Sequence, residues 1–236
     1  MDLIIEEEFG RNLRMVKSRV LEAAERAGRD ARKVRIMAVT KTFPGSAVEL
    51  AWGQGLRLFG ENRVQEAVDK YSRIPDHIDL HLIGHLQRNK ARLAVTTFSC
   101  VQSIDKLGTA LALGKHLDSM STEKKLDILL EVNTSGEESK FGIHTKEELF
   151  TLLEQILSQT RLNIRGLMTV GPLTEDRDKI RRAFTGLADL YRQTGEHYPG
   201  LALDILSMGM SGDFEIAVEE GSSMLRLGTA LFGRRH

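Results

Sequence analysis

The chain has one cysteine, no excess of either charge and no long apolar run, and each absence excludes a class of protein. The lone Cys100 cannot form an intramolecular disulfide, which suits a reducing compartment. Lysine plus arginine (33) equal aspartate plus glutamate (33), so the charge pattern favours neither a nucleic-acid nor a membrane partner. The start, MDLIIEEE, is too acidic for a signal peptide. We therefore expect a cytoplasmic protein that binds a small molecule.

What the sequence does contain is a regular alternation of strand-like and helix-like stretches. Buried-strand patterns cover residues 34–40, 56–59, 80–83, 98–101, 126–132, 164–170, a stretch ending at Ser207, and 224–227. Helical patterns cover residues 3–27, 47–54, 64–72, 87–93, 106–120, 146–158, 177–195 and a segment that begins at Asp213. Strands that alternate with helices indicate a parallel sheet with right-handed crossovers.

These patterns predict an α/β fold, a single (β/α)8 TIM-type barrel with an extra N-terminal helix. The length, 236 residues, fits one such domain, so we expect residues 1–236 to form a single domain. An open doubly wound sheet is the alternative. It would carry a glycine-rich dinucleotide fingerprint after its first strand, where this chain has TFPGS instead.

The run from residue 206 to residue 233 holds two candidate anion sites. In the first, SMGMSG (207–212), a small-residue turn links an apolar stretch to a helical pattern, so backbone N–H groups converge at a helix N-terminus. The second, RLGT (226–229), offers a cation, a glycine for close backbone approach and a hydroxyl. Loops after strands seven and eight of a barrel commonly bind phosphate. The alternative is that both turns only cap an αβ unit.

Polar side chains follow the predicted strands, where a barrel places its chemistry. They are Lys41, Glu61, Asn62, His85, Ser103, Asp105, Asn133, Thr134, Thr169, Ser207, Ser211, Arg226 and Thr229. A lysine across a barrel mouth from a phosphate site predicts a Schiff base with a phosphorylated aldehyde. The residues alone leave open whether that aldehyde is a sugar-phosphate substrate or pyridoxal 5'-phosphate (PLP).

Three of these candidates also have structural interpretations. Lys41 fits a strand-end lysine with its head in water, and Asn62 fits the N-cap of the following helix. Arg226 fits one half of a structural salt bridge. His81 and His85 lack the spacing and the carboxylate neighbours of a metal site, so we expect no metal.

Seven motifs, taken together and in order, point to one family. They are AVTKTFP around Lys41, FGENRVQE (59–66), HLIGHLQRNK (81–90), VQSIDK (101–106), LLEVNTSGEESKFGI (129–143), IRGLMTV (164–170) and LSMGMSGDFEIAVEEGSSMLRLGTALFG (206–233). Along nearly its whole length the chain resembles the pyridoxal-phosphate homeostasis protein family, whose fold is similar to the N-terminal barrel of alanine racemase. The resemblance implies a PLP-binding barrel.

The resemblance also implies roles for individual residues. Lys41 forms the internal aldimine with PLP, and Arg226 is the partner of the pyridine nitrogen. The phosphate is held by Ser207, Gly209, Ser211, Gly228 and Thr229, mostly through backbone N–H and hydroxyl groups. Asn62 and His81 lie near the ring.

The function implied is vitamin B6 homeostasis: a monomer without catalytic activity that stores PLP or delivers it to apo PLP-dependent enzymes. The alternative is a PLP-dependent amino-acid racemase or another enzyme that acts at Cα. Alanine racemase relatives supply a second base as a tyrosine from a C-terminal domain. We expect that domain to be absent here, because the chain ends at His236, and we expect Tyr71, Tyr191 and Tyr198 to lie away from the strand ends. A class I aldolase is a third possibility, for which no proton-transfer residue is assigned.

Overall fold

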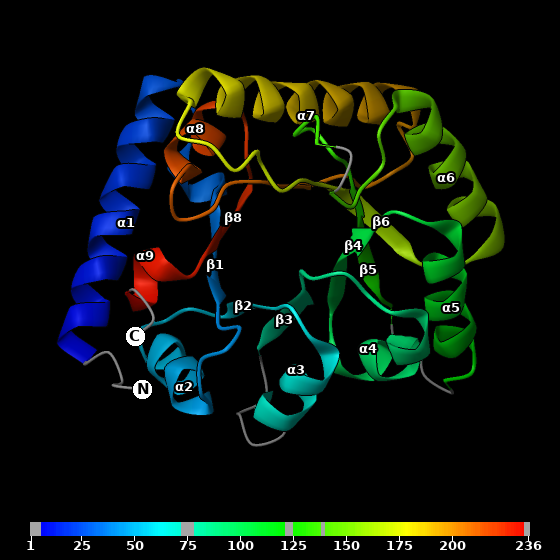
Figure 1. Cartoon of the computed structure of the whole chain (residues 1–236), viewed down its shortest axis with the longest axis horizontal. Helices are drawn as coiled ribbons and strands as arrows, with labels where there is room; N and C mark the ends of the chain where they lie inside the picture. The colour runs from blue at the N-terminus through cyan, green and yellow to red at the C-terminus, as the bar shows by residue number, and fades with distance from the viewer. Residues whose placement is uncertain (1–5, 72–77, 121–124, 138–139, 234–236) are drawn as a thin grey trace.

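The structure, a computed structural model, describes residues 6–71, 78–120, 125–137 and 140–233. Eight strands pair in chain order and all in parallel, and β1 pairs with β8 to close a barrel (Figure 1). The strands are β1 (Arg35–Val39), β2 (Leu58–Glu61), β3 (Asp79–Leu82), β4 (Cys100–Ile104), β5 (Asp127–Glu131), β6 (Asn163–Met168), β7 (Ile205–Ser207) and β8 (Met224–Leu227). The predicted TIM-type barrel is confirmed.

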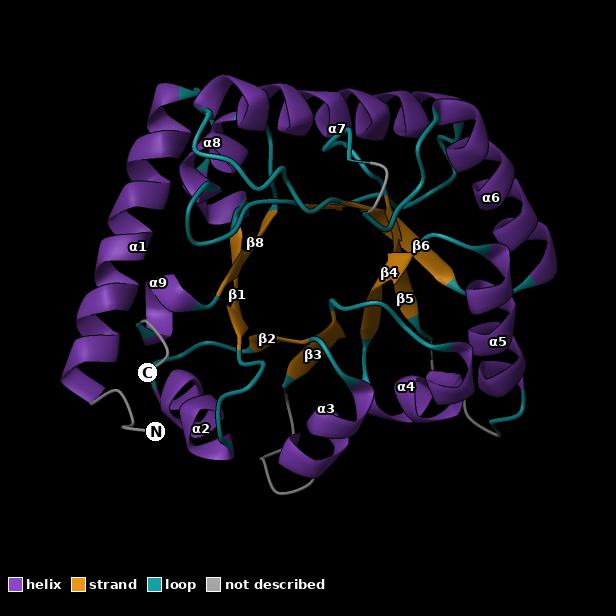
Figure 2. Ribbon diagram, in the orientation of Figure 1, coloured by secondary structure: helices purple, strands orange, loops and turns teal. Residues whose placement is uncertain are grey.

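Helices surround the barrel (Figure 2). They are α1 (Glu6–Arg26), α2 (Gly45–Gly53), α3 (Val64–Tyr71), α4 (Ala91–Thr97), α5 (Leu107–Asp118), α6 (Lys146–Gln159), α7 (Arg177–His197), α8 (Phe214–Glu219) and α9 (Thr229–Phe232), with short 3-10 turns η1 (Ala31–Lys33) and η2 (Arg88–Lys90). Within the described ranges, no helix is long and apolar enough to cross a membrane.

The extra N-terminal helix, α1, packs along the outside of the barrel against α8 and α9. Its apolar residues recur at helical spacing and form one buried stripe that includes Phe9, Leu13, Val16 and Val20. The Phe9 ring lies 5.2 Å from the ring of Phe232 in α9. This contact ties the first described helix to the last one, next to the strand that closes the barrel.

The barrel interior is filled by side chains, as expected for eight strands. Its apolar part comprises Met37, Val39, Leu58, Cys100, Leu129, Met168, Ile205 and Met224. Four polar residues, His81, Gln102, Ser207 and Arg226, are buried as well and are joined by hydrogen bonds. The interior therefore combines an apolar part with a polar part whose members are hydrogen-bonded to one another.

Two strands end later than the sequence predicts. β2 continues through Glu61 and β4 through Ile104, whereas the apolar patterns end at residues 59 and 101. The added residues include Glu61, Gln102 and Ser103, which are polar but buried with hydrogen-bond partners, so the apolar pattern misses them. Predicted helical residues 3–5 and 72 lie outside the described residues.

Candidate functional site

Lys41 and Arg226 come from neighbouring strands at the same end of the barrel. Lys41 follows β1 by two residues and is half-buried. Arg226 lies on β8 in register with Met37 of β1. Because parallel strands present their carboxyl ends at one face, the loops after β1, β7 and β8 lie at the same end of the barrel.

The two predicted anion sites form one continuous structure. The Arg226 backbone N–H donates to the Gly209 carbonyl at 3.0 Å, and the Ala230 N–H donates to Ser211 Oγ at 3.0 Å. Gly209 has a φ of +96°, and a Cβ added to it would lie 2.5 Å from Cβ of Ala217. A glycine is therefore required where the turn passes over α8.

This joined turn offers donors for an anion. Within the described part of the chain, no acceptor lies within hydrogen-bond reach of the backbone N–H of Ser211, Gly228 or Thr229. Gly228 caps the short helix α9, and Thr229 is exposed. Converging N–H groups next to a helix start fit a phosphate, which is what the sequence predicts for these loops.

Arg226 is a buried cation whose contacts are to neutral groups. Its Nη1 donates to Ser207 Oγ at 2.7 Å and its Nη2 to the Thr169 carbonyl at 2.7 Å. Burial lowers the pKa of Arg226 to about 10, against the opposing charges of Asp213 and Glu131. The guanidinium therefore stays protonated at neutral pH. Within the described ranges the Arg226 side chain makes no salt bridge, although a structural salt bridge was the alternative interpretation of this residue.

Two residues of the predicted pocket lie inside the barrel. Ser207 is fully buried, and its hydroxyl donates to Gln102 Oε1 while it accepts from Arg226. His81 is 2% exposed, with Nε2 bonded to Asp79 and Nδ1 bonded to Gln102. Both ring nitrogens and the serine hydroxyl thus have protein partners, and the structure joins these two side chains to Arg226 through Gln102.

Asn62 and His85 do lie at the mouth. Asn62 is half-buried directly after β2, and a Cβ on Gly84 would come within 2.3 Å of its carbonyl oxygen. The loops after β2 and β3 are thus packed backbone against backbone. The exposed His85 ring stacks on Phe141 at 4.2 Å. Within the described residues, no group of three or more His, Cys, Asp or Glu is placed to hold a metal ion.

Next to Lys41 lies a group of polar residues that we call the rim cluster: Thr40, Glu61, Glu66, Lys70 and Tyr71. Lys70 Nζ donates to the Thr40 carbonyl at 2.7 Å, to Glu61 Oε1 at 2.7 Å and to Glu66 Oε1 at 3.0 Å. Thr40 Oγ1 donates to Glu61 Oε1 at 2.7 Å and contacts the Tyr71 hydroxyl at 2.8 Å. Tyr71 therefore reaches the end of β1, and the expectation that it lies away from the strand ends is wrong.

The rim cluster fixes a strained turn. Thr42 is the one described residue other than glycine with a positive φ, +66°, a conformation that is costly for a β-branched residue. Its backbone N–H donates to Glu66. Because Lys41 lies between Thr40 and Thr42, and the rim cluster holds both, the backbone that presents Lys41 is fixed from two sides.

Glu131, the last residue of β5, is a site residue that the sequence does not predict. Its side chain is buried, 8% exposed, and makes no hydrogen bond within the described ranges. It lines a cavity of about 270 Å³ with Asn133 and Phe141. Burial raises the pKa of Glu131 to about 7, the charge of Asp105 adds to this and Arg226 opposes it. The sequence does contain a signal for this residue, because Glu131 is a charged residue directly after the apolar run of residues 128–130.

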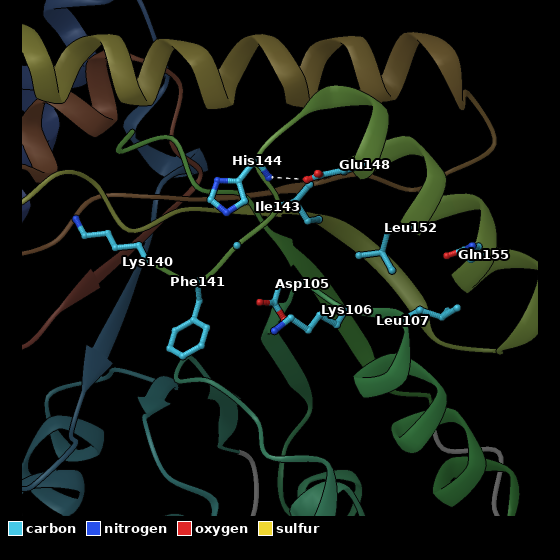
Figure 3. Close-up of a pocket in the computed structure, with 11 residues that line it drawn as sticks. Asp105, Lys106, Leu107, Lys140, Phe141, Ile143, His144, Glu148, Leu152 and Gln155 are labelled. Atoms are coloured by element: carbon cyan, nitrogen blue, oxygen red, sulfur yellow. Dashed lines mark hydrogen bonds between the residues drawn. The ribbon is translucent and has the colours of Figure 1, made fainter. Parts of the chain in front are cut away.

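A neighbouring cavity of about 490 Å³ opens between the loops after β4 and β5 (Figure 3). Asp105 and Lys106 line it from one loop, and Phe141 and His144 from the other. Asp105 Oδ1 is buried without a hydrogen-bond partner within the described residues. This cavity extends the barrel mouth on the side of β5.

Comparisons with known proteins agree on one family. Residues 12–236 match the family model for the alanine racemase N-terminal domain. A pyridoxal phosphate homeostasis protein of Vibrio cholerae is 41% identical over 95% of each chain, and one of Pseudomonas aeruginosa is 41% identical over 95% of this chain and 94% of its own. PipY of Synechococcus elongatus, solved with PLP bound, is 32% identical, with a TM-score of 0.82 over 95% of this chain and all of its own.

Proposed function

This chain belongs to the alanine racemase N-terminal domain family, and from that premise we propose that it is a pyridoxal phosphate homeostasis protein. It binds PLP at the mouth of its barrel, stores it and delivers it. The family was predicted from seven motifs, and the comparisons confirm that prediction. The proposal extends to the whole chain as one PLP-binding domain that acts as a monomer in the cytoplasm.

The observation that carries the proposal is the joined turn after β7 and β8, which lies beside the strand that presents Lys41. The backbone N–H groups of Ser211, Gly228 and Thr229 bind the phosphate. PLP supplies a reactive aldehyde, and the Lys41 amine holds it covalently. Arg226 donates a hydrogen bond to the pyridine nitrogen, and Asn62 lies beside the ring.

Two features bear on the choice between a carrier and an enzyme. Protonation of the pyridine nitrogen would place a second positive charge against Arg226, so the ring stays a weak electron sink, although the racemase barrel carries such an arginine too. Tyr71 is the tyrosine that reaches Lys41's strand, and burial raises the pKa of its hydroxyl far above the ordinary value. A phenol that keeps its proton does not serve as the second base. We propose apo PLP-dependent enzymes as recipients.

One observation favours a second candidate function, an enzyme that acts at Cα. Glu131 is a buried carboxyl group with a pKa of about 7, and it lines the cavity at the barrel mouth. A carboxyl group whose pKa is near neutral is suited to proton transfer. In that case Glu131 would supply the base that the tyrosines do not.

Covalent attachment is tested by reduction with borohydride. The protein incubated with PLP should turn yellow, and reduction should fix the pyridoxyl group on Lys41, as read by peptide mapping. Lys41→Ala should carry no label and keep its fold, whereas Lys106→Ala, which changes another lysine at the barrel mouth, should be labelled normally. A label that remains on a different lysine of the native protein would contradict the assignment.

Carrier and enzyme are separated by proton exchange. The loaded protein, incubated with single-enantiomer amino acids in deuterated water, should show no exchange at Cα at enzymatic rates, on the order of 1–1000 per second. The same protein should activate an added apo PLP-dependent enzyme. Exchange that Glu131→Gln abolishes would replace the carrier proposal with the enzyme.

A further inference from the structure

A continuous series of hydrogen bonds crosses the barrel interior from Arg226 to the opposite face. Arg226 donates to Ser207 Oγ at 2.7 Å, and Ser207 donates to Gln102 Oε1 at 2.7 Å. Gln102 Nε2 lies 2.8 Å from His81 Nδ1, and His81 Nε2 lies 3.0 Å from Asp79 Oδ1. We call these five residues the interior chain. They come from β8, β7, β4 and β3.

In every hydrogen bond of the interior chain, the donor lies on the Arg226 side and the acceptor on the Asp79 side. Gln102 Nε2 also contacts Met224 Sδ at 3.2 Å, a weak acceptor, which places the amide nitrogen on the side of His81. His81 Nδ1 is then an acceptor, and its Nε2 carries the proton and donates to Asp79. A guanidinium stands at one end of the series and a carboxylate at the other. The side chains of Ser207, Gln102 and His81 connect them by hydrogen bonds.

Asp79 is held at the far end by further contacts. Ser99 Oγ donates to Asp79 Oδ1 at 2.6 Å, and Arg35 Nη2 lies 2.7 Å from Asp79 Oδ2. Burial acts to raise the pKa of Asp79, but the bonds to His81 and Ser99 and the charge of Arg35 outweigh it, so the pKa lies well below its usual range. The interior chain therefore ends on a group that remains an acceptor at neutral pH.

The interior links are deeply buried. Ser207 and Gln102 are fully buried and His81 is 2% exposed. A polar group in such a place costs free energy unless every partner is present, so a series of this kind has one low-energy arrangement. Arg226 has no carboxylate in hydrogen-bond contact within the described residues, and its orientation is fixed by Ser207 and Thr169.

We propose that Ser207, Gln102, His81 and Asp79 are positioning residues, which act through one another to hold the Arg226 guanidinium toward the ligand at the barrel mouth. The positioning of Arg226 is independent of what binds there. The consequence for the PLP ring rests on the proposed function. None of the four touches the ligand, yet each affects how Arg226 meets it.

The first test compares two fully buried serines. Ser207→Ala removes a link of the interior chain. Ser222→Ala removes a hydroxyl whose hydrogen bonds, among the described residues, go to the carbonyls of Leu206, Met208 and Met224. Both variants should lose stability by similar amounts. Only Ser207→Ala should shift the absorbance of bound PLP and speed its release, by about tenfold, because the lost bond involves a charged donor.

The same two serine variants are compared by NMR in protein without PLP. The Arg226 side-chain N–H signals should exchange slowly with water in the native protein and in Ser222→Ala, and should broaden or vanish in Ser207→Ala. Nitrogen shifts should place the His81 proton on Nε2. A proton on Nδ1, or equal effects of the two serine variants, would overturn the proposal.

The second test works from the far face of the barrel, where substitution does not open the core. Asp79→Asn replaces the charged terminal acceptor with a neutral amide, which accepts more weakly, and should shift the Arg226 signals and speed PLP release by about twofold. Asp204→Asn breaks a different ion pair, with Arg165, and should change neither. An Asp79 variant that behaves like the Asp204 variant would contradict coupling through the barrel.

The two proposals fail separately. Absence of borohydride labelling at Lys41 would reject the proposed function and leave the Arg226 and His81 signals as they are. Conversely, labelling at Lys41 with Arg226 signals that ignore Ser207 would leave PLP binding in place and reject the positioning role.

Discussion

The rim cluster and the interior chain each hold a cationic side chain next to the proposed PLP site, with different partners. In the rim cluster, Lys70 contacts the carboxylates of Glu61 and Glu66 directly. In the interior chain, Arg226 contacts a hydroxyl and a carbonyl, and the carboxylate of Asp79 lies beyond three neutral links. Direct ion pairs thus hold the backbone that presents Lys41, whereas a series of hydrogen bonds through intermediate side chains holds the Arg226 guanidinium.

The difference follows from how the chain reaches each place, because the central residues of both groups are buried. Four of the five rim-cluster residues lie within the segment 61–71, so charged groups meet over a short stretch. The link between Ser207 and Gln102 joins residues 105 positions apart in the barrel interior. Removing one partner of a buried ion pair leaves an uncompensated charge, whereas removing a neutral link leaves only an unpaired polar group. The comparison predicts larger effects for single changes in the rim cluster.

The largest effect is expected from Lys70→Met. The Lys70 side chain is 6% exposed and that of Glu61 is fully buried, so the variant leaves a buried carboxyl group without its cation. The free energy of unfolding should fall by about 3–5 kcal/mol. Urea unfolding measures it. The double variant Lys70→Met with Glu61→Gln should recover part of the loss, and a double variant as unstable as the single one would contradict the pairing.

A smaller and pH-dependent effect is expected from Glu131→Gln. The pKa of Glu131 is raised from 4.5 to about 7 in the folded chain. As pH rises from about 4.5 to 7, the unfolded chain loses this proton first, so folding stability falls across that window. The loss should be on the order of 1–3 kcal/mol. The variant should lack this fall when urea unfolding is compared at both pH values, and an unchanged slope would show that the carboxyl group titrates normally.

Tyr71→Phe should have a moderate effect on the rim cluster. It removes the hydroxyl in contact with Thr40 Oγ1 and keeps the ring that packs 6.3 Å from Phe59. Stability should fall by about 1 kcal/mol, because Thr40 keeps its bond to Glu61. Tyr191→Phe is the matched control, on the outer helix α7. A loss as large as that of Lys70→Met would mean that the ion pair is not the main support.

Thr42→Gly should have the smallest effect and the opposite sign. The positive φ of +66° strains threonine by about 1–2 kcal/mol and does not strain glycine. Part of the gain is offset by the added freedom of glycine in the unfolded chain, so stability should rise by under about 1 kcal/mol. Thermal unfolding measures it. A loss of stability would show that the threonine side chain, rather than the Glu66 contact, holds the turn.

Much of the site could be predicted from the sequence, because its position depends on local patterns of residues. A lysine after the first strand and two small-residue turns near strands seven and eight predict where Lys41, Ser211 and Gly228 lie, since parallel strands end at one face. The N-terminal helix was predicted from its apolar spacing, and α1 confirms it. These features depend on residues close together in the chain.

The closed barrel decided the rest. In a parallel strand both faces are buried, so the sequence does not show which residues point inward. Only closure placed Ser207 and His81 inside, joined to Gln102, and left Glu131 at the cavity. Those contacts connect strands far apart in the sequence, where no local spacing applies. The sequence by itself therefore determined the barrel and the order of its strands, and the tertiary structure decided which polar side chains lie at the barrel mouth and which lie inside.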